Sequence, residues 1–406
     1  MGAAVRLRQP AERRPAAPVR GADRRDVDPS RPHRRRGDPD DKRHLSGFRL
    51  LPNGDYAFNA RIALARRAEK TLDVQYYLIH NDDVGLQFLR ELRDAAVRGV
   101  RVRVLVDDLY TAGEDELFSG LATHPNVEVR LFNPLPARAE TLGSRVLFSL
   151  HEFGRVNHRM HNKLFIADNS FSVSGGRNMA NEYFMRSESA NFIDLDVMST
   201  GPVVRELSDV FDRFWNSEHA YPVQSLVPAA AQGATARERF DLLVRDVAPN
   251  IALAPVDWLG RTSVQAQLDS GRLDQHFATA HVFADSPAKV AGMDRERLDA
   301  TAVASARNLM RSARSEVLIV SPYFSRQSGR FGEFGSSMGR LHAKVAVIDR
   351  RWLLHRLRLG ADGENIEWVA MDAHGGEIVS TAEPDTSWLL QLRLWLLSPF
   401  VAEELL

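Results

Sequence analysis

The feature that most constrains the fold of this chain is a ten-residue pattern that occurs twice. "RMHNKLFIAD" (159–168) and "RLHAKVAVID" (340–349) both have the frame His-x-Lys-x4-Asp. Only five of the 53 basic residues are lysines, and two of those five stand two residues after a histidine in this frame. Chance repetition at this composition is rare, so the pattern predicts an internal duplication that carries the same three side chains in two copies: His161, Lys163, Asp168, His342, Lys344 and Asp349.

The segments around the two motifs alternate between helix and strand periodicity. Residues 56–69 are typical of an amphipathic helix, and residues 72–78 alternate as in a strand. A helix over about 84–98 and the strand-like "VRVRVLVDD" follow. The same order restarts late in the chain, with a helix in "ATAVASARNLMRSAR" and a strand in "SEVLIVSPYF". This alternation predicts an α/β fold with largely parallel or mixed sheets flanked by helices.

The chain divides by composition and periodicity into four parts. Residues 1–44 are rich in Arg and Pro and predict a disordered tail; 45–219 form the first half; 220–300 form a weakly periodic linker region; and 301–406 form the second half. The two halves are unequal. Tyr77 and His161 are 84 residues apart, whereas Tyr323 and His342 are 19 apart. The second half therefore lacks about one βαβ unit, which normally needs about 30 residues or more.

Bulk composition excludes several kinds of chemistry. The formal net charge is zero, which disfavours a dedicated nucleic-acid binder. The chain has no cysteine, so a thiol nucleophile and a Cys-ligated metal are both excluded. We find neither a run of 18 apolar residues nor the apolar core of a secretory signal, so we expect no transmembrane segment and no signal peptide.

The motif residues suit phosphodiester chemistry. Residues two apart in a strand share a face, so each His and its Lys should project together, and each Asp should support the end of its strand. If the halves fold symmetrically, the two pairs face one cleft. One imidazole can attack phosphorus while the other transfers protons, and the lysines stabilise the charge on the equatorial oxygens. This scheme requires no metal and no cofactor.

A second cluster follows the first motif in "GGRN". Gly175 and Gly176 permit close approach of the backbone to a ligand, and Asn178 offers a neutral donor. We therefore predict that all three residues line the phosphate site.

The paired motifs and the downstream GGRN resemble the phospholipase D superfamily. "DVQYYLIHND", "GGRNMANEYF" and "LRLWLLSPFVAEELL" are similar to its bacterial cardiolipin synthase-like phosphatidyltransferases. The resemblance implies a duplicated phospholipase D fold and phosphatidyl transfer or phospholipid hydrolysis through a phosphohistidine. It also implies that His161 is the nucleophile, that His342 is the general acid and base, and that Glu182 orients a catalytic histidine. The implied partners are a membrane surface and phosphatidylglycerol, with phosphatidylethanolamine as an alternative. The implied location is peripheral at the cytoplasmic membrane, or cytoplasmic.

The second half departs from this pattern. Counting on from Asp349 gives "RLRL" (356–359) where the first half has GGRN, so small donors are replaced by bulky side chains. Two alternatives therefore stay open: a nuclease or phosphodiesterase of the same superfamily, and a pseudoenzyme that binds lipid without turnover. The sequence predicts neither the phosphatidyl donor and acceptor nor the oligomeric state.

Overall fold

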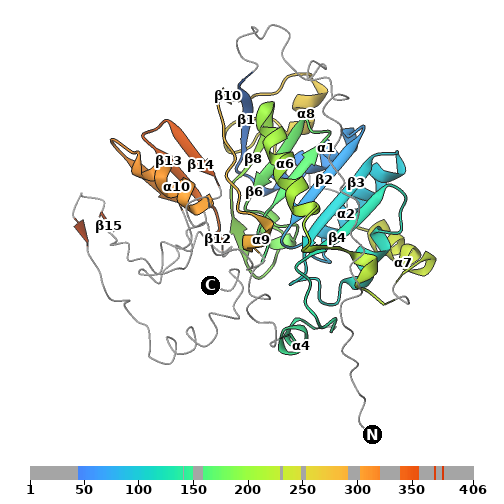
Figure 1. Ribbon diagram of the computed structural model, residues 1–406. Coiled ribbons are helices and arrows are strands. Elements are labelled where there is room, and N and C mark those ends of the chain that lie inside the picture. The colour runs from blue at the N-terminus through green and yellow to red at the C-terminus, as the bar shows by residue number, and fades with distance from the viewer. Residues whose placement is uncertain are drawn as a thin grey trace.

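The computed structural model describes residues 44–139, 141–149, 159–228, 232–247, 253–290, 302–320, 339–355, 370–371 and 377–378. The predicted tail, apart from residue 44, and the divergent residues 356–359 lie outside these ranges. Figure 1 shows a large sheet with its helices, and a smaller sheet with one helix beside it.

The large sheet has nine strands in the order β10-β1-β8-β6-β5-β2-β3-β4-β9. The pairs β2–β3 and β3–β4 are parallel, as expected for βαβ units, and all other pairs in this sheet are antiparallel. The sheet is therefore mixed, as the sequence predicts. Its strands are β1 (Ser46–Leu51), β2 (Thr71–Tyr76), β3 (Arg101–Asp107), β4 (Val127–Phe132), β5 (Leu164–Ala167), β6 (Phe171–Gly175), β8 (Asp196–Thr200), β9 (Ala220–Pro222) and β10 (His276–Ala278).

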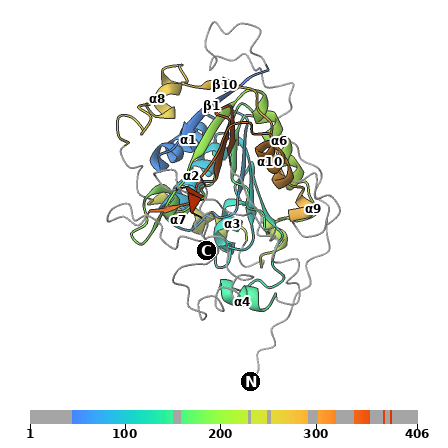
Figure 2. The same cartoon turned by 90° about the vertical axis from the view of Figure 1, so that its left-hand side faces the viewer.

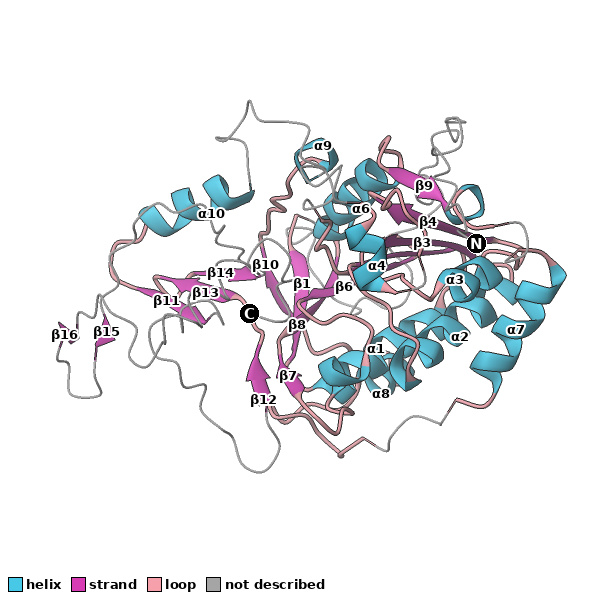
Figure 3. Ribbon diagram, turned by 90° about the horizontal axis from the view of Figure 1, so that it is seen from below, coloured by secondary structure: helices cyan, strands magenta, loops and turns pink. Residues whose placement is uncertain are grey.

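Helices cover both faces of this sheet, each over its own apolar cluster. Figure 2 shows α1 and α6 on opposite sides of the strands, and Figure 3 shows α2, α3, α7 and α8 on the same side as α1. None of the described helices is both long and apolar enough to cross a bilayer. The helices around this sheet are α1 (Gly54–Arg67), α2 (Asp83–Val97), α3 (Asp115–Leu121), α4 (Leu142–Leu147), η3 (Asn181–Phe184), α6 (Pro202–Trp215), η4 (Val223–Ser225), α7 (Ala234–Arg245), α8 (Val264–Asp269) and α9 (Pro287–Val290).

Helix α2 illustrates how the sequence specifies these elements. The side chain of Asp82 caps its first turn by accepting a hydrogen bond from the Gly85 N–H at 2.9 Å. The apolar side chains of Val84, Phe88 and Leu92 recur at four-residue spacing and are fully buried. The predicted helix over 84–98 is thus confirmed within one residue at either end.

Residues 220–300 contribute short elements that pack on the first half. Helix α7 packs against α3 and α2, α8 packs against α1, and β10 pairs with β1 at the edge of the large sheet. Weak periodicity led the sequence analysis to treat this region as a linker. These elements are short and depend on contacts with the larger body. The domain boundaries stay predictions.

The small sheet repeats part of the large one. Strands β11, β13 and β14 are antiparallel neighbours, as β2, β5 and β6 are. The register is also equivalent, because Leu72 pairs with Ala167 in the large sheet and Val317 pairs with Ile348 in the small one. Among the described residues, no strands in the small sheet correspond to β3 and β4. Its elements and the remaining strands are α10 (Ala302–Arg311), β11 (Val317–Val320), β13 (Val345–Ile348), β14 (Trp352–His355), β7 (Asn191–Ile193), β12 (Gly339–Leu341), β15 (Ala370–Met371) and β16 (Glu377–Ile378).

The motif aspartates have the same role in both units. Asp168 accepts backbone hydrogen bonds from Glu69, Lys70 and Thr71 at 2.7–2.9 Å, where the chain enters β2. Asp349 accepts backbone hydrogen bonds from Arg314, Ser315 and Glu316 at 2.7–3.0 Å, where the chain enters β11. Both residues have a positive φ, 51° and 50°. Each aspartate thus supports a strand end, which is the supporting role that the motif spacing predicts.

The donors around Asp349 also affect its ionisation. The backbone N–H of Glu316, followed by that of Arg314 and the hydroxyl of Ser315, holds the pKa of Asp349 well below its ordinary value. The carboxylate therefore stays ionised, and its contacts persist, over the whole pH range in which a free aspartate would be charged. They are lost only as the pH falls through this lowered pKa.

We expect Asp168→Ala to lower the free energy of unfolding by about 2–4 kcal/mol, because it removes an acceptor shared by three backbone donors. Asp269→Ala is a suitable control, since it removes only an exposed pair with Arg67 and should cost less than about 1 kcal/mol. Urea unfolding measures both, and amide exchange at residues 69–71 should accelerate only in Asp168→Ala. Equal losses in the two variants would contradict the role of Asp168.

Candidate active site

The first motif lies where the central strands β2 and β3 of the large sheet end. His161 and Lys163 precede β5 rather than lying within it, since regular pairing with β2 begins at Leu164. The two side chains nevertheless converge: Lys163 Nζ is 3.1 Å from both ring nitrogens of His161, and it donates to the His161 carbonyl at 3.2 Å. The predicted pairing of imidazole and ammonium is thus present without strand geometry.

Tyr77 packs against this pair. Its ring centroid lies 4.7 Å from that of His161, and Lys163 Nζ lies 5.2 Å from the centre of the same ring. Tyr110 supports Tyr77 from another side, edge to face at 5.3 Å. A buried aromatic ring therefore restricts both polar groups of the first motif.

The second motif docks on the first half through a short sheet. Strand β12 pairs in parallel with β7, and the His342 N–H donates to the Ile193 carbonyl at 2.8 Å. The imidazole of His342 packs against Tyr183 and Phe192 at centroid distances of 5.5 and 5.4 Å. The second copy of the frame thus contacts residues that follow GGRN in the first half.

Asp194 orients His342. One oxygen of its carboxylate lies 2.5 Å from His342 Nδ1, and both side chains are buried. Burial alone would raise the pKa of Asp194, but the hydrogen bond and charge of His342, with the charge of Arg177, hold that pKa below its ordinary value. Among the residues that the structure describes, none hydrogen-bonds His342 Nε2. This carboxylate–imidazole pair leaves Nε2 as the ring nitrogen available for proton transfer.

A chain of contacts connects the two histidines. Asn178 accepts from the Leu78 N–H at 3.3 Å and donates to the Tyr183 hydroxyl at 2.9 Å. Leu78 adjoins the tyrosine that packs on His161, and Tyr183 packs on His342. The Asn178 side chain therefore lies between the surroundings of the two motifs. Its predicted contact with a phosphate stays a prediction.

The two glycines of GGRN make room for carboxylates. A Cβ on Gly176 would lie 2.1 Å from Asp194 Oδ2, and a Cβ on Gly175 would lie 1.7 Å from Asp196 Oδ1. Asp196 is itself buried and pairs with Arg61 at 2.9 Å. Both glycines are thus required where they stand because their missing Cβ atoms leave space for buried carboxylates, a role that the sequence pattern does not predict. Their approach to a ligand stays a prediction.

We expect Gly176→Ala to displace the Asp194 carboxylate from His342, and Gly175→Ala to disturb the buried pair of Asp196 and Arg61. Each should lower the free energy of unfolding by about 1–3 kcal/mol. Gly143→Ala has nothing within 4 Å of the added Cβ and should be neutral within about 0.5 kcal/mol. Thermal unfolding compares the three. Unchanged stability of both GGRN variants would show that these close approaches are not present.

Glu182 and Lys344 are the remaining predicted site residues. Glu182 lies in η3, and its charge is one of several that raise the pKa of His80, after the hydrogen bond from that ring to Asp82. Lys344 lies directly before β13. The described residues contain no group of three or more His, Asp or Glu side chains placed to hold a metal ion.

Two functional candidates were missing from the sequence analysis. Asp194 and Asp196 stand two apart in "NFIDLDVMS", where apolar side chains alternate with these acids as in a strand. Acidic residues in such a segment must be paired when buried, and this was the available signal.

Comparisons with known proteins show what the first half of the chain is similar to. Residues 62–215 match the family model described as "Cardiolipin synthase, PLD-like domain". This segment is a phospholipase D-like domain. The phospholipase D-like domain contains the first motif, GGRN and Asp194, and the second motif lies beyond it.

Individual relatives cover the same part of the chain. Cardiolipin synthase C of Escherichia coli (strain K12) is 46% identical over 171 residues, which is 42% of this chain and 35% of that protein. Cardiolipin synthase A of Pseudomonas fluorescens is 30% identical over 178 residues, 43% of this chain and 35% of that protein. The chain thus spans about a third of the length of these curated relatives. Among solved structures, phosphatidylserine synthase of Haemophilus influenzae is 12% identical, with a TM-score of 0.42 over 77% of this chain and 80% of that one.

Proposed function

We propose that this protein transfers a phosphatidyl group between phospholipids through a covalent phosphohistidine, with hydrolysis as a side reaction. The contact between His342 and Asp194 carries this proposal, because it joins the second motif to the phospholipase D-like domain and presents Nε2 as a proton carrier. Without that contact, the two motifs would be related by ancestry alone.

The reaction proceeds in two displacements. His161 attacks the phosphorus of the donor lipid, so that a P–N bond forms and the bond to the headgroup oxygen breaks. His342 gives its proton to the departing alkoxide. An acceptor hydroxyl then attacks phosphorus, His342 takes its proton, and the P–N bond breaks. Water in place of the acceptor gives hydrolysis.

The charged residues have separate roles in these steps. Lys163 and Lys344 stabilise negative charge on the equatorial phosphoryl oxygens, and Asn178 adds a neutral donor. Asp194 stabilises the imidazolium form of His342, as a buried carboxylate does in other acid–base pairs. Asp168 and Asp349 position the strands that carry the motifs.

The substrate class is a phospholipid at a membrane surface. Phosphatidylglycerol serves as donor and acceptor, and phosphatidylethanolamine is a second donor. The protein acts peripherally at the cytoplasmic membrane, or in the cytoplasm. The resemblance of the motif segments to cardiolipin synthases supports this choice over a nucleic-acid substrate, and the zero formal charge of the chain agrees with it.

A vesicle assay tests the function. Purified protein is incubated with phosphatidylglycerol vesicles, with or without phosphatidylethanolamine, and separately with single-stranded DNA. We expect a cardiolipin-type product with release of the headgroup alcohol, and no cleavage of DNA. Vesicle binding without any lipid product would favour the pseudoenzyme, and comparable turnover of DNA would favour the nuclease.

A further inference from the structure

Strand β3 ends in two consecutive carboxylates, Asp107 and Asp108, which are both fully buried. Their partners differ. Asp107 accepts from Arg159 Nε at 2.7 Å, from Arg159 Nη2 at 2.5 Å and from the Met160 N–H at 2.7 Å. Asp108 accepts from the Leu135 N–H at 2.8 Å and pairs with Arg138 and Arg145, which follow Leu135 in the chain. Of the two, only Asp107 contacts the described residues that directly precede His161.

The two residues held by Asp107 directly precede His161. Arg159 also donates to the Asn133 carbonyl at 3.1 Å, and the buried Met160 sulfur accepts from Gln75 Nε2 at 3.0 Å. Regular strand pairing starts again at Leu164. His161 therefore lies between two fixed points, the Asp107 contacts on one side and β5 on the other.

We infer that Asp107 is a positioning residue for His161, acting through the Arg159 guanidinium and the Met160 backbone. This inference rests on the proposed function of His161. It assigns to Asp107 a role in placing the attacking imidazole, and a misplacement of about 1 Å costs roughly 100-fold in rate. Asp107 also accepts from the Leu109 N–H at 3.0 Å, which fixes the carboxylate to the end of its own strand.

Asp107→Asn tests the inference because it keeps the size of the side chain. Asparagine has one acceptor oxygen in place of two, so it cannot serve both the Arg159 guanidinium, which donates to Oδ1, and the Met160 N–H, which donates to Oδ2. Its amide nitrogen opposes one of these donors, so one of the two contacts that hold the segment before His161 is lost. Arg159→Lys is the second variant, since it keeps the charge and gives up the two-pronged contact.

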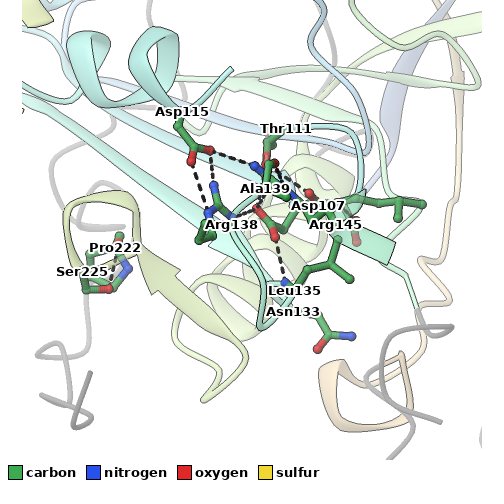
Figure 4. A network of polar contacts seen from close by, with 12 residues as sticks. Asp107, Thr111, Asp115, Asn133, Leu135, Arg138, Ala139, Arg145, Pro222 and Ser225 are labelled. Atoms are coloured by element: carbon green, nitrogen blue, oxygen red, sulfur yellow. Dashed lines mark hydrogen bonds and ion pairs between the residues drawn. The ribbon is translucent and has the colours of Figure 1, made fainter. Parts of the chain in front are cut away.

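Asp108→Asn is the matched control. It removes the same charge from an equally buried neighbour, but the contacts of Asp108 are with Thr111, Leu135, Arg138 and Arg145, none of which adjoins His161. Figure 4 shows this neighbouring network, in which Arg138 and Arg145 also approach Asp115. A general loss of stability at this end of β3 should affect both variants.

The experiment measures the rate of phosphatidyl-enzyme formation, KM, and the imidazole NMR signals of His161 without substrate. We expect Asp107→Asn to slow adduct formation about 10- to 100-fold at unchanged KM, with Arg159→Lys intermediate and Asp108→Asn within about threefold of wild type. The His161 signals, assigned with His161→Ala, should shift in Asp107→Asn and Arg159→Lys but not in Asp108→Asn.

Two results would overturn the positioning role. One is an equal effect of Asp107→Asn and Asp108→Asn on rate and His161 signals, which would mean that both carboxylates serve stability alone. The other is an unchanged His161 signal in a folded Asp107→Asn or Arg159→Lys protein. If wild type forms no adduct, the proposed function fails, and the NMR comparison still decides where Asp107 acts.

Discussion

His161→Ala should form no phosphatidyl-enzyme adduct and should lower the rate of phosphatidyl transfer by at least about 10⁴-fold, as loss of a catalytic nucleophile does in other enzymes. The physical reason is that Lys163 and the aromatic ring of Tyr77 hold the His161 imidazole in place as the attacking group, and alanine has no nitrogen that could form the P–N bond. Labelled phosphatidylglycerol, rapid quenching and intact-protein mass spectrometry detect the adduct, which should be labile in acid and stable in alkali.

His281→Ala provides the control for this experiment. His281 is an exposed histidine in the segment after β10, away from both motifs in the chain. It should leave adduct and turnover unchanged. An adduct of normal yield in His161→Ala, or one mapped to another residue, would contradict the assignment of the nucleophile.

Asp194→Asn should lower phosphatidyl transfer about 10²- to 10⁴-fold, because an amide at this position can donate to His342 Nδ1 and so favours the wrong tautomer. When the donor lipid carries a nitrophenyl headgroup, that headgroup departs as nitrophenolate without protonation. Adduct formation from that lipid should therefore recover, while turnover of phosphatidylglycerol stays slow. Stopped-flow release of nitrophenol and product analysis measure the two quantities separately.

The interaction between Asp194 and His342 can be isolated with a double-mutant cycle. If Asp194 acts through His342, the double variant Asp194→Asn/His342→Ala should be no slower than His342→Ala. Additive losses in the cycle would contradict the pairing.

The Asp194 carboxylate also makes the stability of the folded protein depend on pH. Its pKa is held low in the folded protein, so its contribution to stability is present above its pKa in the unfolded chain, about 4. That contribution is lost as the pH falls through the lower pKa of the folded protein.

Sequence alone predicted what depends on local pattern. The paired motifs, the helices over 56–69 and 84–98, and the support of strand ends by Asp168 and Asp349 follow from spacing and periodicity. The structure contains both aspartates in that role, and α1 (Gly54–Arg67) and α2 (Asp83–Val97) lie within two residues of the predicted bounds. In the second unit the aspartate occupies the same place relative to its strands, which a repeated frame requires.

Long-range pairs were harder to predict. The partner of Asp107 lies 52 residues away and that of Asp194 lies 148 away, so no local rule connects them. The pattern predicts that the glycines of GGRN let the backbone approach a ligand. In the structure, the atoms nearest to a Cβ added at either glycine belong to the carboxylates of Asp194 and Asp196. The elements between 220 and 300 are too short for periodicity to reveal, since each is stabilised by the helix or strand on which it packs.

The second half has "RLRL" (356–359) at the spacing where the first half has GGRN, so its side of the site differs in sequence. The contacts of His342 described above all come from the first half, through Ile193, Asp194, Tyr183 and Phe192. Among the residues that the structure describes, the first half therefore sets the position of this imidazole. On this basis we expect activity to survive the shortened second half.

A crystal structure with vanadate, which takes the five-coordinate geometry of the phosphoryl transition state, tests the central claim most directly. The account predicts one vanadate with the imidazoles of His161 and His342 on opposite sides, each with a ring nitrogen within about 3.5 Å of the bound group. Lys163 should contact an equatorial oxygen. Vanadate bound to His161 alone, with His342 remote from it, would contradict a shared phosphate site and leave the two motifs related by descent only.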